Sequence, residues 1–246
     1  MADSSLAGKT ALVTGAGVRV GRAIAVGLAE AGADLAVHYR SSEQEAADVA
    51  ALIRTLGRRS ATFQGDLSLP EDCRRIVQQT LRHFGGLDFL VHSAANFHRA
   101  PLEETDEALW DSAMDVNARA GLLLAREAAP ALRAREGRIV IVSDFLALNP
   151  ARGYVAHSVS KAAAEGLVRA LAVELAPEVT VNGIAPGTVL PPDGTPPEEA
   201  AQWARRVPLK RNGEPDDVAR AVVFLCAGPS FLTGQVLRVD GGRALV

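Results

Sequence analysis

The sequence predicts a doubly wound α/β fold built on one parallel sheet. Short apolar runs alternate with longer segments of helical period almost from end to end. Such repeats of strand, helix and strand are typical of parallel sheets with right-handed crossovers. A chain of 246 residues can bury one sizeable core and shows no domain linker, so we expect a single domain, residues 1–246. The expected architecture is a Rossmann-like three-layer sandwich.

Five apolar runs predict the strands, because each is short and bounded by turn residues. In chain order they cover residues 10–13, 35–37, 87–91, 139–142 and 179–184. Segments of helical period predict helices at 21–31, 42–56, 70–84, 108–132 and 155–175. Glycines at positions 15, 32, 57 and 137 stand at the ends of these elements, where turns and helix stops need them.

One proline-rich stretch interrupts this rhythm. Residues 186–197 read PGTVLPPDGTPP, which holds too many prolines for a helix or a central strand. The stretch follows the carboxyl end of a predicted strand, where open α/β sheets bind ligands. We therefore expect a substrate loop or lid around residues 186–206. A plain surface excursion is the alternative.

The overall charge argues against nucleic acid as a partner. The formal net charge is −3 and the pI is near 6.0, whereas phosphate binding would need a basic face. No apolar run reaches membrane-spanning length and the N-terminus has no apolar signal region, so we expect a cytoplasmic protein without membrane contact. Cys73 and Cys226 lie far apart with no metal-like spacing, which predicts free buried thiols and no metal site.

A glycine-rich turn, TGAGVRVG over residues 14–21, follows the first predicted strand and opens the first helix. Gly15 and Gly21 let the backbone turn tightly and approach a pyrophosphate, which would sit at the helix N-terminus beside Val20. A tight turn without a ligand is the alternative. The strand–turn–helix context favours a nucleotide site.

The second predicted strand continues as His38-Tyr39-Arg40-Ser41 and offers no acidic residue for a ribose 2′-hydroxyl. Arg40, together with Arg19 in the glycine turn, instead suits a 2′-phosphate, because guanidinium binds phosphate in bidentate fashion. Each arginine alone could be a solvated surface residue. Together, with the acid missing, they predict NADP(H) as the cofactor.

The chain resembles the short-chain dehydrogenase/reductase family over essentially its whole length. The glycine turn looks like that family's Thr-Gly-x-x-x-Gly-x-Gly motif, with Arg19 replacing the middle glycine. Further similar segments are Gly65-Asp66-Leu67, Asn117 in the central helix, Asn182 to Gly187, Leu232 to Gln235, and Val239 to Gly242. The resemblance implies a small-molecule substrate, a homotetramer, and further cofactor contacts from Asp66, Leu67, Ser93, Ala94, Pro186 and Gly187.

Within the family the sequence is most similar to the pteridine reductases. Those proteins also carry Arg in the glycine turn and a His-Tyr stretch after the second strand. They place an aspartate where most of the family has serine, as Asp144 does here. Phe97 matches the phenylalanine that sandwiches a pterin ring, and Tyr154 stands where pteridine reductases have a second tyrosine. The likeness implies that Phe97, Asp144 and Tyr154 contact the substrate.

Two positions depart from the family pattern. The Asn-Asn-Ala-Gly segment after the fourth strand reads His92-Ser93-Ala94-Ala95 here. The catalytic Tyr of the family's Tyr-x-x-x-Lys motif is His157, whereas Lys161 is present. The resemblance implies that Lys161 binds the nicotinamide ribose.

Asn117, Asp144, His157 and Lys161 are the candidate catalytic residues. Reduction of C=O or C=N leaves charge that a positioned acid must neutralise. His157 and Lys161 are four residues apart, so both can address the cleft from one helix face, although imidazole is shorter than phenol. Asp144 either holds His157 in one tautomer or binds an amino or ring N–H group of the substrate. A structural histidine in a decayed site is the alternative.

The leading hypothesis is an NADPH-dependent oxidoreductase that reduces a C=N or C=O bond of a small, flat, pterin-like substrate. A second hypothesis is a non-catalytic NADP(H)-binding homologue, since the family's tyrosine is missing. A third is a carbonyl reductase similar to β-ketoacyl-carrier-protein reductases, from whose pattern both Asp144 and His157 depart.

Overall fold

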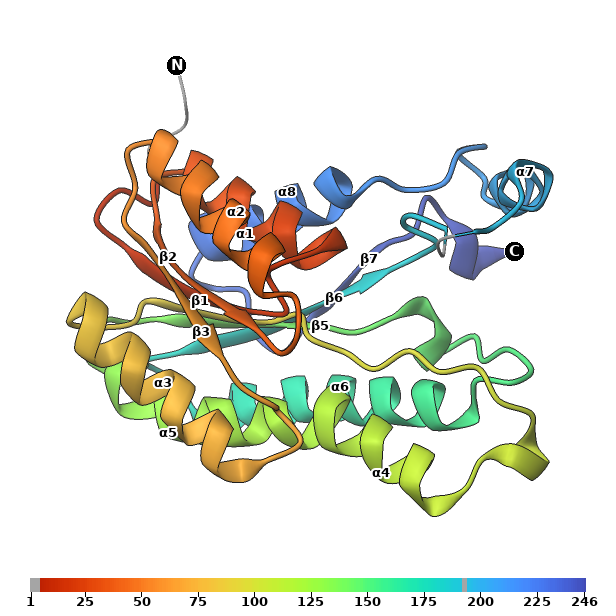
Figure 1. The fold of residues 1–246 in the computed structure, drawn as a ribbon, viewed down its shortest axis with the longest axis horizontal. Coiled ribbons are helices and arrows are strands. Elements are labelled where there is room, and N and C mark those ends of the chain that lie inside the picture. The colour runs from red at the N-terminus through yellow and green to blue at the C-terminus, as the bar shows by residue number, and fades with distance from the viewer. Residues whose placement is uncertain (1–4, 192–193) are drawn as a thin grey trace.

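The computed structural model describes residues 5–191 and 194–246, and these form one sheet of parallel strands covered by helices on both faces (Figure 1). The strands are β1 (Thr10–Thr14), β2 (Asp34–Tyr39), β3 (Ser60–Gln64), β4 (Phe89–His92), β5 (Arg138–Val142), β6 (Thr180–Pro186) and β7 (Val236–Val239). Their order is β3-β2-β1-β4-β5-β6-β7, and every neighbouring pair is parallel. The predicted fold class is confirmed.

The helices form the two outer layers of the sandwich (Figure 1). One face carries α1 (Arg19–Glu30), α2 (Glu43–Thr55) and α8 (Pro215–Ala227), and the other carries α3 (Pro70–Phe84), α4 (Glu107–Met114), α5 (Ala120–Arg133) and α6 (Val155–Glu174). A π-helical turn, Asp115–Arg119, joins α4 to α5. Among the described residues, no helix is long and apolar enough to cross a bilayer.

Successive residues of a central strand pack into different layers, because strand side chains alternate between the two faces. In β1, Ala11 and Val13 belong to the core under α1 and α8, whereas Leu12 belongs to the core above α3, α5 and α6. All three side chains are fully buried. Burial on both faces explains why the central strands read as uninterrupted apolar runs. Cys73 and Cys226 lie in these cores as free thiols, as predicted.

In the described part of the chain, two strands and two α-helices were not predicted by the sequence patterns. The edge strands β3 and β7 are half-exposed and mix polar with apolar residues. The helix α8 was not predicted, and α7 (Pro197–Arg206) lies within the segment predicted as a lid. Residues 192 and 193 of that lid lie outside the described part of the chain. The helix predicted at 108–132 is divided by the π-helical turn.

The sheet order reverses direction between β1 and β4, which are neighbours although β2 and β3 come between them in the chain. The connections that follow β1 and β4 therefore diverge to opposite faces of the sheet. Such a point leaves a crevice outside the carboxyl ends of the strands, which is where open α/β sheets bind ligands.

Candidate active site

A cleft of about 460 Å³ opens at this point of the sheet. All fifteen residues that were predicted to contact a cofactor line it: Gly15, Arg19, Val20, Gly21, His38, Tyr39, Arg40, Ser41, Asp66, Leu67, Ser93, Ala94, Lys161, Pro186 and Gly187. Asp144, His157 and Phe97 line the same cleft. The structure therefore brings together segments that lie far apart in the chain, from Gly15 to Gly187.

The glycine turn is packed too tightly for side chains. A Cβ atom on Gly21 would lie 2.0 Å from the carbonyl oxygen of Gly15, and one on Gly15 would lie 2.9 Å from Cα of Ala94. Gly15 also has a positive φ of 65°, which glycine adopts without steric cost. The turn therefore presents bare backbone to the cleft at the N-terminus of α1, the arrangement that suits a pyrophosphate.

Arg19 connects the glycine turn to the predicted substrate loop. Its guanidinium donates to the carbonyl oxygen of Leu190 at 2.6 Å, across 171 residues of sequence. Both residues have positive φ angles, 49° for Arg19 and 54° for Leu190. The start of α1 and the segment after β6 thus meet beside the cleft.

His38 holds the glycine turn through hydrogen bonds to backbone atoms. Its Nδ1 accepts the main-chain N–H of Gly15 at 3.1 Å, so Nε2 carries the proton and donates to the carbonyl oxygen of Gly65 at 3.1 Å. Burial lowers the pKa of His38 to about 4. The imidazole is therefore neutral, and both of its nitrogens bind backbone.

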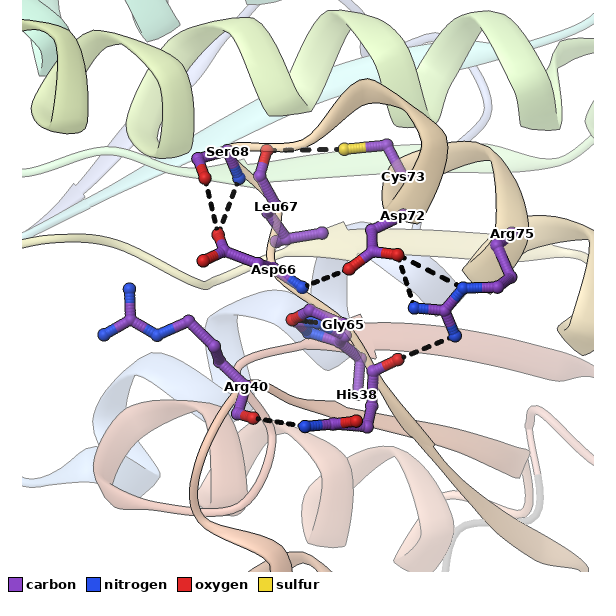
Figure 2. A network of polar contacts seen from close by, with 10 residues as sticks. His38, Arg40, Gly65, Asp66, Leu67, Ser68, Asp72, Cys73 and Arg75 are labelled. Carbon is purple, nitrogen blue, oxygen red and sulfur yellow. Dashed lines mark hydrogen bonds and ion pairs between the residues drawn. The ribbon is translucent and has the colours of Figure 1, made fainter.

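A polar network surrounds the loop after β3 (Figure 2). The carboxylate of Asp66 accepts from the main-chain N–H and the hydroxyl of Ser68, which lowers the pKa of Asp66. The main-chain N–H of Asp66 donates to Asp72, whose carboxylate is paired with Arg75. Arg40 leaves the end of β2 with an exposed side chain that interacts electrostatically with Asp66. The Arg40 guanidinium thus lies near the hydrogen-bonded Asp66 carboxylate at this end of the cleft.

His92, which replaces an asparagine of the family motif, is part of the structural support of the cleft. Its Nε2 donates to the carbonyl oxygen of Val116 at 3.0 Å, and its Nδ1 accepts from the hydroxyl of Thr14 at 3.0 Å. The Thr14 oxygen in turn accepts the N–H groups of Ser93 and Ala94. Burial, reinforced by the charge of Lys161, lowers the pKa of His92 to about 3. The imidazole ring in this series of hydrogen bonds is therefore neutral.

Asn117 is fully buried in the π-helical turn and holds the backbone of Asn96. It accepts the N–H of Asn96 at 2.7 Å, and its amide donates to the carbonyl of Asn96 and to Ser160. The Asn117 side chain does not line the cleft. It therefore positions the loop after β4, which carries Phe97.

Lys161 lies at the bottom of the cleft and is 3% exposed. Its ammonium donates to the carbonyl oxygen of Val142 at 2.8 Å. Burial lowers the pKa of Lys161 to about 8, and the charge of Asp144 partly opposes that shift. The lysine is thus charged at neutral pH and close to its titration range.

His157 stands between a carbonyl and a carboxylate. Its Nδ1 lies 3.2 Å from the carbonyl oxygen of Asn96, and its Nε2 lies 3.5 Å from Oδ2 of Asp144. The other oxygen of Asp144 accepts the main-chain N–H of Leu146 at 2.8 Å. The register of Asp144 with His157 that the sequence suggested is thus present, and Asp144 also caps the short helical turn that follows it.

An aromatic shelf borders this pair. The Phe97 ring meets the His157 ring edge-on at 4.6 Å and lies 5.0 Å from the Tyr154 ring. Phe97 is 49% exposed and lines the cleft, whereas Tyr154 does not line it. Tyr154 therefore packs against the Phe97 ring without lining the cleft itself.

Two residues of the site carried no sequence signal. The main-chain carbonyl of Asn96 binds both Asn117 and His157, and the main-chain carbonyl of Val142 binds Lys161. Backbone atoms are the same in every residue type, so residue identity does not reveal such roles.

The fold and the cleft define a member of the doubly wound class of dinucleotide-binding folds. The sequence model of the family described as "Enoyl-(Acyl carrier protein) reductase" matches residues 15–244. A hydroxynaphthalene reductase-like protein, Arp2, of Metarhizium brunneum is 38% identical over 97% of this chain and 96% of its own length. The chain belongs to the short-chain dehydrogenase/reductase family.

Solved structures agree with this assignment. A short chain dehydrogenase from Burkholderia cenocepacia in complex with NADP is 38% identical, with a TM-score of 0.91 over 98% of this chain and 100% of that one. The angucycline C-6 ketoreductase LanV with bound NADP is 32% identical, with a TM-score of 0.92 over 98% of both chains. The likeness to pteridine reductases in particular stays a prediction.

Proposed function

We propose that this protein is an NADPH-dependent reductase that acts on a C=O or C=N bond of a small, flat, ring-containing substrate. The observation that carries the proposal is the convergence of Lys161, Asp144 and His157 on the cleft that also holds the glycine turn. A proton source and a nucleotide-shaped backbone cradle thus share one cavity.

The described residues fit a dinucleotide phosphate. Bare backbone at Gly15 and Gly21 leaves room for a pyrophosphate, and a Cβ on Gly187 would lie 2.8 Å from Cα of Asp240, so this position is also closed to side chains. Arg40 and Arg19 would bind the 2′-phosphate, with no acid at the end of β2 to oppose it. Structural relatives crystallised with NADP support this cofactor.

The remaining predicted contacts follow from the family resemblance, and all of these residues line the cleft. Asp66 and Leu67 would contact the adenine, and Ser93, Ala94, Pro186 and Gly187 the nicotinamide half. Lys161 would bind the nicotinamide ribose. NADPH supplies a hydride when bound, and Lys161, Asp144 and His157 provide the positive charge and the proton that reduction requires.

The shape of the site favours a flat substrate. Phe97 is exposed and lines the cleft, where an aromatic ring can stack on its side chain. The names of relatives, a hydroxynaphthalene reductase-like protein and an angucycline ketoreductase, describe fused-ring substrates. A pterin-like compound belongs to the same class of flat rings, and Asp144 could accept its N–H groups.

The direct test is turnover by the purified protein. We expect loss of NADPH absorbance with at least one member of a panel of aromatic ketones, quinones, cyclic imines, pterins and dihydrofolate, and weaker use of NADH. Inertness toward the whole panel, with NADPH binding intact, would overturn the proposal.

A non-catalytic NADP(H)-binding protein is the second candidate, and one observation favours it. Among the described residues, the Nε2 atom of His157 has no hydrogen-bond partner and is shielded from solvent, so the ring that replaces the family's phenol offers no exposed proton donor there. Substitution His157→Tyr separates the two: a large gain of reductase activity indicates a decayed site, whereas a loss indicates a specialised one.

We also propose a homotetramer, as in the family. Apolar side chains are exposed on α6, where Val159 is 42% and Val173 83% accessible. Sedimentation velocity would show one species of four chains, and a monomer would contradict the proposal.

A further inference from the structure

We infer that the carboxyl group of Asp144 delivers the proton to the substrate, and that His157 is a buried positioning residue that shares this proton with the carboxyl. The inference rests on the proposed reductase function and specifies which side chain the substrate meets. In the family one tyrosine donates the proton. Here His157 occupies the position of that tyrosine, and Asp144 takes over its role as the proton donor.

The proton on His157 can be placed from its neighbours. A carbonyl oxygen only accepts, so Nδ1, 3.2 Å from the carbonyl oxygen of Asn96, carries a hydrogen. In a neutral ring Nε2 would then hold a lone pair and face Oδ2 of Asp144 at 3.5 Å. Nε2 is buried, so leaving it without a donor while it faces a carboxylate oxygen is unfavourable. A proton shared by Nε2 and Oδ2 removes this conflict.

Access to this proton is one-sided. His157 is 2% exposed, and its Nε2 is shielded from solvent. The edge-on Phe97 ring covers the imidazole at 4.6 Å. The side chain of Asp144 is 23% exposed and lines the cleft. A substrate atom in the cleft can therefore touch the Asp144 carboxyl but not Nε2 of His157.

The Asp144 carboxyl is also held in place. Its Oδ1 accepts the N–H of Leu146 at 2.8 Å, which directs Oδ2 toward His157. Lys161 lies close enough to interact electrostatically with Asp144, and its ammonium is fixed on Val142. The proton-sharing carboxyl thus interacts with both His157 and Lys161 of α6 and faces the cleft.

The proton step balances with the hydride that NADPH supplies. The hydride adds to the carbonyl carbon, and the π electron pair moves to the oxygen. The proton that Nε2 and Oδ2 share bonds to Oδ2 as its bond to Nε2 breaks, with that electron pair left on Nε2. The O–H bond of Asp144 then breaks with its electrons left on Oδ2, and a new O–H bond forms on the product. Asp144, which is open to solvent, then regains a proton from water and shares it again with His157.

Two matched variants test whether Asp144 or His157 delivers the proton to the substrate. Asp144→Asn keeps an acceptor for Leu146 but cannot release a proton, whereas His157→Gln keeps an N–H donor toward Asp144. With phenanthrenequinone and NADPH, we expect Asp144→Asn to lower kcat about a hundredfold or more and His157→Gln to lower it at least tenfold less. NADPH affinity should stay unchanged in both. Equal losses, or a larger loss in His157→Gln, would overturn the inference.

A measurement without substrate separates this inference from the proposed function. In nitrogen NMR of isotope-labelled histidine, His157 is assigned by the signals that His157→Gln removes. We expect both ring nitrogens to carry protons in the wild type and Nε2 to be bare in Asp144→Asn. A bare Nε2 in the wild type contradicts the shared proton. Inertness of the wild type toward every substrate contradicts the reductase proposal alone.

Discussion

The main-chain N–H of Gly15 donates to Nδ1 of His38 at 3.1 Å, which ties the glycine turn to β2. The second nitrogen of His38 donates to the carbonyl of Gly65, so the ring also ties the turn to the end of β3. Because Nδ1 must accept, this arrangement needs a neutral ring, and burial keeps the pKa of His38 at about 4. The hydrogen bonds that join the carboxyl ends of β1, β2 and β3 at the cleft thus require an uncharged imidazole.

We therefore predict that acid destabilises the protein through His38. Its pKa is about 6.5 when unfolded and about 4 when folded, so the unfolded chain binds more protons between these values. The neutral His38 ring contributes about 3 kcal/mol to the free energy of unfolding. This contribution is complete above pH 6.5 and is lost as the pH falls toward 4. Urea unfolding of His38→Asn should show a shallower loss over this range. The exposed His98→Asn should keep the wild-type slope; if His38→Asn keeps it too, the prediction is wrong.

Lys161 should show the same linkage at alkaline pH. Burial lowers its pKa from 10.5 to about 8, so the charged form is costly in the folded protein below pH 8. We expect Lys161→Met to be more stable than the cofactor-free wild type at pH 7, by about 3 kcal/mol at most. That advantage should shrink as the pH rises from 8 toward 10.5, and catalytic activity should be lost. A stability difference independent of pH would contradict it.

The periodicity of the sequence predicted the central strands because these are buried on both faces and read as unbroken apolar runs. The same signal missed β3 and β7, since each lies at an edge of the sheet and exposes part of its side chains. It also missed the π-helical turn Asp115–Arg119, because apolar spacing does not distinguish that turn from the helices on either side.

At the site, all the predicted residues except Asn117 and Tyr154 line the cleft, but the sequence did not predict how they are hydrogen-bonded. The sequence left open whether Asp144 holds His157 in one tautomer or binds an N–H group of the substrate. In the structure the carbonyl of Asn96 lies beside Nδ1 and Asp144 faces Nε2. This arrangement decides which group a substrate can reach. It depends on a backbone carbonyl, whose position only the folded loop after β4 determines.

The tight packing of the glycine turn predicts a strong effect of a single methyl group. Gly21→Ala places Cβ 2.0 Å from the carbonyl oxygen of Gly15, so the turn must shift. We expect a loss of about 1–3 kcal/mol in stability and a large loss of NADPH affinity. Gly166→Ala in α6 is the matched control, because its Cβ meets only Arg169 at 4.0 Å. It should be neutral or slightly stabilising, as helix propensity requires. Similar behaviour of both variants in thermal unfolding and calorimetric titration would refute the argument.

Discrimination between NADPH and NADH should depend on Arg40, whose exposed guanidinium lines the cleft where β2 ends without an acidic residue. A charge-assisted contact to a phosphate contributes about 1.5–3 kcal/mol, so Arg40→Ala should weaken NADPH binding by roughly ten- to a hundredfold. NADH binding, which involves no 2′-phosphate, should change little. Arg82→Ala on the exposed side of α3 removes the same charge far from the cleft and controls for net charge. Titration calorimetry with both cofactors measures the four affinities. If Arg40→Ala weakens NADPH and NADH equally, Arg40 does not contact the 2′-phosphate and the specificity must be set elsewhere in the cleft.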